Sequence, residues 1–170
     1  MDYKLDLDYK LGMHQSLKEQ SDIWDFEKEE LDPEELEHDM CNFMLNHNGI
    51  GLAANQLNIR KRVFTIVPGF PEPFAVFNPV ILESSEDKVL QKEGCLSFPG
   101  LWLHLKRPKS IIAQYQNSKG VTKEAKIEGY LATCFQHELD HLNGICFVDK
   151  VGRLKLQLAM TKLKKRLKKQ

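Results

Sequence analysis

The segment His137-Glu138-Leu139-Asp140-His141 constrains the fold of this chain more than any other part of its sequence. Residues i and i+4 of an α-helix lie on one face, so both imidazoles can reach a single metal ion if the segment is helical. Glu138 can then contact a water molecule on that metal. The flanking sequence is apolar at helical spacing, with Leu131, Ala132, Phe135, Leu139 and Leu142. The motif therefore predicts a buried helix that carries a metal site; the alternative is two surface histidines one turn apart.

This helix is expected to run from about residue 129 to 142 and to stop at Asn143-Gly144. An earlier helix is predicted to begin at Asp32, a good N-cap, with Pro33 at the first helical position. Its apolar face is formed by Leu36, Met40, Phe43 and Met44. A third, amphipathic helix is predicted at about 152–168. One stripe of it carries Leu156, Met160, Leu163 and Leu167, with lysines opposite.

Between the first two helices the pattern changes to short runs rich in β-branched residues and bounded by Pro, Gly or Asn. These runs predict strands at 62–67, 75–77, 79–82 and 110–115. Residues 117–120 suit a hairpin loop that leads into a further strand at 121–127. The order of elements predicts the α+β class, with mostly antiparallel short strands around a central metal-binding helix and a C-terminal amphipathic helix.

With 170 residues, the chain is long enough to bury a hydrophobic core as a single domain over residues 1–170. Its 24 Lys and Arg balance its 24 Asp and Glu, so overall charge favours neither membrane attachment nor sequence-specific nucleic-acid binding. No apolar run approaches the roughly 18 residues of a transmembrane helix, and the acidic N-terminus lacks the features of a signal or transit peptide. We therefore expect a cytoplasmic protein whose four cysteines are reduced.

A catalytic metal site needs a third protein ligand and one open position for water. Thermolysin-like peptidases use a Glu well downstream, but here Asp149 is the only carboxylate side chain after the motif. Metzincins continue the motif to a third histidine, at a position where this chain has Phe147. The third ligand must therefore lie upstream. The best candidate is Cys95, which follows a glycine in a segment that ends in Pro99-Gly100.

The other cysteines lie among apolar residues and are expected in the core: Cys41, Cys134 and Cys146. The other histidines have polar neighbours and are expected at the surface: His14, His38, His47 and His104. The segment from Gly49 to Gln56 is unusual because its small residues let the backbone approach another group closely, and Gln56 offers an amide at its end. It does not indicate a nucleotide site, since a G-x-G alone, without a following G-K-[ST], is a weak signal.

Three segments occur in order along the chain: Gly49-Ile50-Gly51-Leu52-Ala53-Ala54-Asn55-Gln56, Glu93-Gly94-Cys95-Leu96-Ser97 and His137-Glu138-Leu139-Asp140-His141. Together they resemble the three signature motifs of the peptide deformylase family, G-x-G-L-A-A-x-Q, E-G-C-L-S and H-E-x-D-H. The resemblance extends from about residue 36 to 150. It implies a metal-dependent hydrolase that removes the N-formyl group from the N-terminal formylmethionine of nascent polypeptides and releases formate.

The resemblance also implies a role for each motif. One divalent metal ion, natively Fe²⁺ with Zn²⁺, Ni²⁺ or Co²⁺ able to replace it, would be bound by Cys95, His137 and His141, with water as the fourth ligand. Glu138 would deprotonate this water, which attacks the formyl carbon, and would then pass the proton to the leaving amine. The Gln56 amide and the backbone N–H of Leu96 would join the metal in stabilising the oxyanion.

By family position, an apolar slot beside the metal would take the methionine side chain. Its lining would be Ile50, Tyr130, Thr133, Cys134 and His137, with Glu93 at the edge and the backbone of Gly49 and Gly51 close to the substrate. Tyr130 and Thr133 are more polar than the aliphatic residues usual there, which points to a shifted substrate preference. Trp102 stands where many bacterial members carry Arg, so contacts at the mouth of the site are expected to differ.

Charge is unevenly distributed along the chain. Residues 1–40 contain fourteen acidic and four basic side chains, whereas residues 150–170 contain nine basic and no acidic ones. Deformylases of the bacterial type are thought to dock on the ribosome through a basic C-terminal helix. Such a face would be formed here by Lys155, Lys162, Lys165, Arg166 and Lys169. The alternative is a helix that only covers the core and pairs with the acidic N-terminal third.

Two other functions remain open from the sequence. One is a different metal-dependent amidase or peptidase that shares the helix. The other is a structural or regulatory metal-binding module without turnover, which should show four protein ligands, whereas the sequence offers only three good ones.

Overall fold

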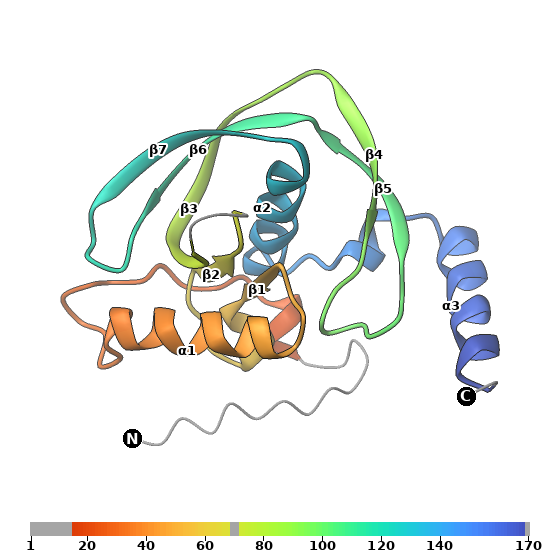
Figure 1. Ribbon diagram of the computed structural model, residues 1–170, viewed down its shortest axis with the longest axis horizontal. Helices are drawn as coiled ribbons and strands as arrows, with labels where there is room; N and C mark the ends of the chain where they lie inside the picture. Colours follow the sequence, from red (N-terminus) through yellow and green to blue (C-terminus); the bar gives the residue numbers. More distant parts are fainter. Residues whose placement is uncertain (1–14, 69–71, 169–170) are drawn as a thin grey trace.

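The structure is a computed structural model that describes residues 15–68 and 72–168 (Figure 1). The helices are α1 (Pro33–Asn46), α2 (Gly129–Leu142) and α3 (Arg153–Leu167), with short 3₁₀ helices η1 (Gln15–Lys18), η2 (Ala54–Leu57) and η3 (Phe147–Lys150). The strands are β1 (Gly51–Ala53), β2 (Val63–Ile66), β3 (Phe74–Ser84), β4 (Lys88–Glu93), β5 (Leu103–Pro108), β6 (Ser110–Gln116) and β7 (Thr122–Glu128). The α+β class and the three helices predicted from the sequence are confirmed.

Five strands form an antiparallel sheet in the order β1-β2-β3-β6-β7, and β4 and β5 pair separately as a two-stranded ribbon. The chain enters and leaves this ribbon side by side, because Ser85 N–H donates to the carbonyl of Ser110 and Lys109 N–H donates to that of Asp87. The ribbon therefore continues β3 and β6 away from the main sheet. In Figure 1, α2 stands between β3 and the ribbon, and α1 lies below the sheet.

The two faces of the sheet are covered by different helices. On one face, Phe64 of β2 packs edge-on against Phe135 of α2, with 5.0 Å between the ring centroids. On the other face, Val63 joins a cluster with Met40 and Met44 of α1. Because both faces are covered, every residue of β2 is buried, which explains its unbroken run of Val, Phe, Thr and Ile. The Asp32 side chain caps α1 as predicted, accepting the backbone N–H groups of its first turn.

The runs predicted as two strands at 75–77 and 79–82 form one strand, β3, with a register shift between them. Asn78 lies at the shift with a positive φ of 49°. Its side chain accepts from Trp24 N–H and donates to the Trp24 carbonyl, which stabilises this backbone conformation. Pro79, which has no N–H to donate, follows at the irregular point of the ladder.

The sequence analysis did not predict β1, β4 or β5. In the ribbon, the inward-facing side chains include Glu93 and Arg107, both buried, while Leu90 is 59% exposed. In β4 this reversal hides the alternation expected of a strand with one apolar face, whereas β5 keeps it in its first half, where Leu103 and Leu105 are buried. Glu93 and Arg107 form an ion pair with each other, and their burial is possible for that reason.

Helix α3 lies beyond the ribbon, at the right edge of Figure 1. Leu163 is buried against a cluster under β5 and η3, and Leu156 and Met160 pack beside it. The prediction that Leu167 also packs inward is wrong: it is 58% exposed, because the last turn of α3 extends past the ribbon (Figure 1). Lys169, assigned to the basic face, and His14 lie outside the described residues.

Residues 15–31, whose structure the sequence did not predict, run across one end of α2. Ser21 N–H donates to the carbonyl of Leu142, and Asp22 forms an isolated bridge with Lys61. Trp24 is 2% exposed and packs edge-on against Phe77 at 5.1 Å. This segment thus supports the helix that carries the histidine motif.

Candidate active site

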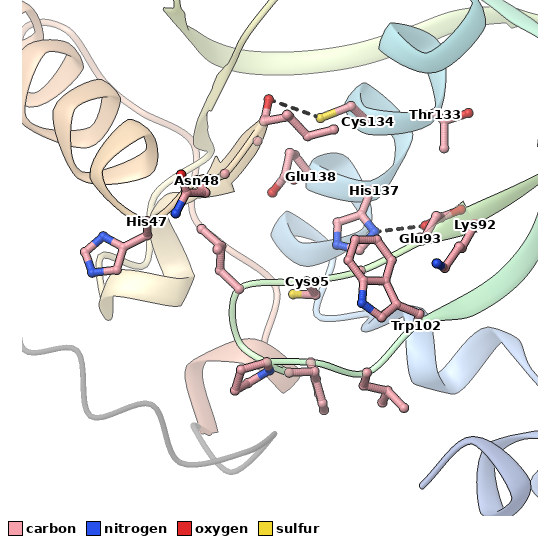
Figure 2. Close-up of a pocket in the computed structure, with 18 of the residues that line it drawn as sticks. His47, Asn48, Lys92, Glu93, Cys95, Trp102, Thr133, Cys134, His137 and Glu138 are labelled. Atoms are coloured by element: carbon pink, nitrogen blue, oxygen red, sulfur yellow. Dashed lines mark hydrogen bonds and ion pairs between the residues drawn. The ribbon is translucent and has the colours of Figure 1, made fainter. Parts of the chain in front are cut away.

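A cavity of about 630 Å³ lies between the end of α1, strand β1, helix α2 and the segment that follows β4. Figure 2 shows the sources of its walls: His47 and Asn48 follow α1, Cys95 and Trp102 lie in the segment between β4 and β5, and Cys134 and Glu138 project from α2. The three segments singled out in the sequence therefore meet around one space.

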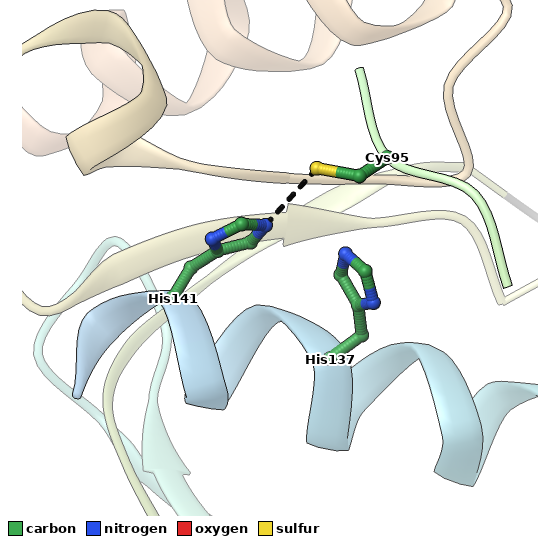
Figure 3. A group of neighbouring side chains, drawn as sticks. All are labelled: Cys95, His137 and His141. Atoms are coloured by element: carbon green, nitrogen blue, oxygen red, sulfur yellow. Dashed lines mark hydrogen bonds between the residues drawn. The ribbon is translucent and has the colours of Figure 1, made fainter. Parts of the chain in front are cut away.

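Cys95, His137 and His141 form a compact group at one end of this cavity (Figure 3). Their possible ligand atoms all lie within 4.8 Å of one another, and Cys95 Sγ is 3.2 Å from His141 Nε2. The histidines are one turn apart on α2, and Cys95 lies in a tight turn closed by a hydrogen bond from Phe98 N–H to the Cys95 carbonyl. In the described part of the chain, no fourth His, Cys, Asp or Glu joins this group. A thiolate and two imidazoles suit zinc and similar transition-metal ions.

A chain of buried charges stands behind His137. Its Nδ1 lies 2.9 Å from Glu93 Oε2, and Glu93 accepts two hydrogen bonds from Arg107 at 2.6 and 2.8 Å. Arg107 also donates to Asp140 at 2.7 Å. Burial opposes ionisation of Glu93, but its bonds from Arg107 and His137 outweigh burial and lower its pKa to about 2. An ionised Glu93 fixes the His137 ring with Nε2 towards Cys95.

The electrostatics of the two histidines fit a cation between them. Burial disfavours a charged His137, but hydrogen bonds with Cys95 and Glu93 prevail and raise its pKa to about 10. The negative charge of Glu93, which favours a proton there, also favours a metal ion. Burial, and then the charge of His137, lower the pKa of His141 well below its usual value, so His141 is neutral and has a lone pair for a metal.

Glu138 lies beside this group and is 4% exposed. Burial raises its pKa to about 7, despite the positive charges of His137 and Arg107. A Cβ added to Gly51 would collide with its carboxylate and with Cys134 Sγ, so a glycine at this position of β1 is required for the close approach. A carboxylate with a pKa near neutrality can take up and release a proton.

Gln56 lies on the other side of the cysteine. Its Oε1 accepts the backbone N–H of Ala53 at 2.8 Å, which orients the amide. Its Nε2 then donates to Ser97 Oγ at 2.9 Å and lies 3.5 Å from Cys95 Sγ. Gln56 therefore lines the cavity with its amide nitrogen beside the metal-binding group, and Leu96 lines the cavity as well.

The residues expected to contact substrate all line the cavity: Gly49, Ile50, Gly51, Glu93, Tyr130, Thr133 and Cys134. Their exposure differs: Cys134 and Thr133 are buried, whereas Ile50 and Tyr130 are 56% and 51% exposed. The Tyr130 hydroxyl donates to the carbonyl of Val67 at 3.4 Å, and Thr133 bonds back to its own helix. The polar atoms of both side chains are thus bound to backbone carbonyls.

Trp102 forms the outer wall and is 49% exposed. The Lys92 ammonium lies 4.8 Å from its ring centroid, a cation–π contact visible in Figure 2. Gly94 lets the ring approach closely, since a Cβ there would be 2.9 Å from it. The mouth of the cavity is therefore aromatic.

The sequence model of the polypeptide deformylase family matches residues 10–157 of this chain. The chain belongs to the peptide deformylase family. Among its relatives, the peptide deformylase of Bartonella tribocorum is 43% identical over 141 residues, which cover 79% of each chain. The peptide deformylase of Thermotoga petrophila is 44% identical over 73% of this chain and 75% of its own.

The fold is also that of solved deformylases. A crystal structure of a peptide deformylase from Synechococcus elongatus, in complex with actinonin, superposes with a TM-score of 0.84 at 34% identity. The match covers 94% of this chain and 89% of that one. Among the described residues of this family member, no helix is long and apolar enough to cross a membrane.

Sequence reasoning missed part of the cavity of this deformylase-family chain. His47 was expected at the surface, but it is partly buried and lines the cavity. Its ring stacks on that of Phe43, with 4.0 Å between the ring centroids. The wall at 98–101 was also missed. The stacking partner of His47 is four residues away on the same helix, a spacing that could have revealed the contact. His38 and His104 are exposed as predicted.

Proposed function

We propose that this chain hydrolyses the N-formyl group of the N-terminal formylmethionine of nascent polypeptides and releases formate. One observation carries the proposal: a buried carboxylate and an oriented side-chain amide flank a group of three metal-binding side chains at the end of a cavity. A base and neutral hydrogen-bond donors around a metal site suit hydrolysis of a carbonyl compound. Family membership supports a formamide as that compound.

In this proposal Cys95, His137 and His141 hold one divalent ion, natively Fe²⁺. The buried, neutral His141 and the anionic surroundings of His137 both fit a bound cation. When bound, such an ion polarises a carbonyl and makes water a stronger nucleophile. Because thiolate and imidazole suit several ions, Zn²⁺, Ni²⁺ and Co²⁺ are expected to replace it.

Glu138 is the proposed proton carrier. Its carboxylate takes a proton from the attacking water as the new C–O bond forms at the formyl carbon. It then gives that proton to the amine as the C–N bond breaks, which leaves formate and a free N-terminus. Burial raises the pKa of Glu138 to about 7, close to the value at which one group serves in both directions.

Gln56 and Leu96 are the proposed oxyanion donors. The bond of Oε1 to Ala53 N–H orients the Gln56 amide beside the cysteine, and its Nε2, which lies 3.5 Å from Cys95 Sγ, would turn its N–H to the oxyanion as negative charge develops. The backbone N–H of Leu96, in the turn next to Cys95, is the second donor. The methionine side chain of the substrate would pack against the cavity wall formed by Ile50, Tyr130, Thr133 and Cys134.

Formate release from formyl-Met-Ala-Ser tests this function directly. We expect turnover that a metal chelator abolishes and that added Fe²⁺, Ni²⁺ or Co²⁺ restores. The matched control is N-acetyl-Met-Ala-Ser, whose extra methyl group lies where the formyl hydrogen would be. Cleavage of internal peptide bonds without formate release would favour a different metal-dependent peptidase. Tight metal binding with no hydrolysis of either substrate would favour a structural or regulatory module.

We further propose that the single catalytic domain acts in the cytoplasm and docks on the ribosome through α3. The structure supports a positively charged outer face: Lys162 and Lys165 are exposed, and α3 contains no acidic residue. In the described part of the chain, no ion pair joins α3 to the acidic residues before position 40. Lys155 and Arg166 instead donate to the carbonyls of His104 and Gly100, which hold α3 on the body.

Charge reversal tests this docking better than truncation, because removing residues 161–170 would also remove the buried Leu163. We expect Lys162→Glu combined with Lys165→Glu to reduce co-sedimentation with ribosomes at low salt and to leave turnover of a free tripeptide unchanged. Wild-type co-sedimentation should itself fall steeply with salt, since counterions are released on binding to RNA phosphates. Equal co-sedimentation of the variant would leave α3 as a structural element only.

A further inference from the structure

The two histidines of α2 differ in how their outer ring nitrogens are bound. His137 directs Nδ1 to Glu93 Oε2 at 2.9 Å. His141 directs Nε2 to Cys95, and its Nδ1 is buried with no hydrogen-bond partner among the described residues. A histidine that binds metal through one ring nitrogen almost always donates the other N–H to an acceptor, which fixes the ring. An acceptor for His141 must therefore come from the residues packed around the end of α2.

Asn55 is fully buried at this end of α2. Its Nδ2 donates to the backbone carbonyl of His141 at 2.6 Å and to that of Ser16 at 3.2 Å. These two bonds orient the amide, so its other atom, Oδ1, is an acceptor, and Oδ1 also has no partner among the described residues. An unpaired buried donor and an unpaired buried acceptor thus lie on two residues that are already hydrogen-bonded to each other.

Two other buried acceptors in this region lack partners in the described part of the chain, Glu138 Oε2 and Ser21 Oγ. The Glu138 carboxylate lies against Gly51 on the cavity side of α2. Ser21 is bound to the carbonyl of Leu142 through its backbone. Of the three, Asn55 is the residue whose side chain is bonded to His141 itself. Leaving both atoms unpaired in the interior would be costly, which favours an interaction between them.

We propose that Asn55 is a positioning residue for the metal site: Nδ2 holds the backbone of His141, and Oδ1 accepts the Nδ1 proton of His141 through one buried water. The contact keeps Nε2 of His141 directed at Cys95, as Glu93 does for His137. The inference rests on the proposed function, because it requires His141 to bind metal. Asn55 occupies the unspecified position of the G-x-G-L-A-A-x-Q motif, so the role belongs to this chain's own residue.

The unmodified protein provides the first test. In the zinc-loaded, ¹⁵N-labelled full chain, long-range ¹H–¹⁵N spectra report which ring nitrogen of each histidine carries a proton. We expect the His141 proton on Nδ1, with exchange against solvent far slower than for the exposed His38. A proton on Nε2, or Nδ1–H exchange as fast as that of His38, would overturn the proposal. This measurement needs no variant and is independent of any folding defect.

A variant series separates the two halves of the contact. Asn55→Leu keeps the size but removes both hydrogen-bonding groups, and Asn55→Asp keeps an acceptor but loses the donor. Ser16→Ala is the matched control, since it removes the bond from Ser16 Oγ to the Asn55 carbonyl and leaves the amide intact. We expect zinc affinity to fall about 10- to 100-fold in Asn55→Leu, less in Asn55→Asp, and not in Ser16→Ala. The absorption bands of the Co²⁺ form should shift in the same order.

Wild-type zinc affinity and an unchanged cobalt spectrum in a folded Asn55→Leu protein would overturn the inference and leave the proposed function intact. Failure of the wild-type chain to bind one metal ion would instead overturn the proposed function, and this inference with it. The two failures are therefore distinguishable from the metal content of the wild-type protein alone.

Discussion

The metal end of the cavity and its mouth are stabilised in different ways. At the metal end, side chains are linked in series: His137 to Glu93, Glu93 to Arg107 and Arg107 to Asp140. His137, Glu93 and Arg107 are buried, and the Asp140 side chain is 14% exposed. At the mouth, Trp102 is half exposed, and its ring makes a cation–π contact with Lys92.

This difference indicates that the metal end of the cavity sets the rate of the reaction and that the mouth sets the choice of substrate. Groups that take part in bond making must be held within a fraction of an ångström, which linked and buried side chains achieve. A mouth that admits many peptide sequences needs apolar surface more than precise placement. We therefore expect substitutions at the metal end to change metal content or kcat, and substitutions at the mouth to change KM.

The largest effect is expected from the ligands themselves. Cys95→Ala, His137→Ala and His141→Ala should each abolish tight metal binding and, with it, activity, because two donors hold an ion far less strongly than three. Elemental analysis of the purified proteins measures this. The controls Cys41→Ala and Cys146→Ala remove thiols outside the group and should retain the ion. Full metal occupancy in Cys95→Ala would contradict the assignment of the third ligand.

Glu138→Gln should keep the metal but lose about 10²- to 10⁴-fold in kcat, the usual contribution of a general base. Burial raises the pKa of Glu138 to about 7, and a bound cation would lower it. Since the ionised form acts as the base, wild-type kcat/KM should fall as pH drops through this pKa. That acid limb should be absent from the pH profile of the variant. A near wild-type rate in Glu138→Gln would show that another base acts.

Gln56→Ala should lose on the order of 10²-fold in kcat with the metal retained, the scale for one oxyanion donor. The same side chain also accepts from Ala53 N–H, so thermal stability is measured alongside. Ser97→Ala serves as the control, because it removes the hydroxyl that the Gln56 amide contacts but leaves the amide in place. A change in KM with kcat preserved would assign Gln56 to substrate binding instead.

The smallest effect is expected at the mouth. Trp102→Arg should leave kcat and metal content unchanged and alter KM about two- to fivefold, the scale of an exposed aromatic contact. The direction should depend on the peptide: KM rises for substrates with apolar residues after the methionine and falls for acidic ones. Steady-state kinetics on a matched pair of formyl-Met peptides measures this. Unchanged KM for both peptides would place Trp102 outside the path of the substrate.

The sequence predicted the elements whose signals are local. The cap at Asp32, the hairpin of β6 and β7 and the bounds of α2 follow from residues within a few positions of one another. The ribbon was missed because Glu93 and Arg107 resemble surface charges until their pairing, fourteen positions apart, is known. The exposure of Leu167 depends on where the ribbon ends, which helical periodicity does not report.

The site shows the same division. The three motifs predicted which side chains gather at the metal end, but not what stands behind them. Arg107 carries no motif of its own, and the contact between Asn55 and His141 joins residues 86 positions apart. Supporting contacts of this kind are set by packing, which a single sequence does not reveal.

The wide spacing of these groups along the chain also has a consequence for biogenesis. A polypeptide leaves the ribosome from its N-terminus at roughly 5–20 residues per second, and segments fold as they emerge. Strands β1 to β3 and helix α1 are synthesised long before the second histidine, whereas the proposed ligands are complete only after residue 141. With these ligands, metal binding would thus occur late in the synthesis of the chain. Under the proposed ligation, a chain that stalls before α2 lacks both histidines of the site, so a tightly bound ion would mark chains in which α2 has been completed.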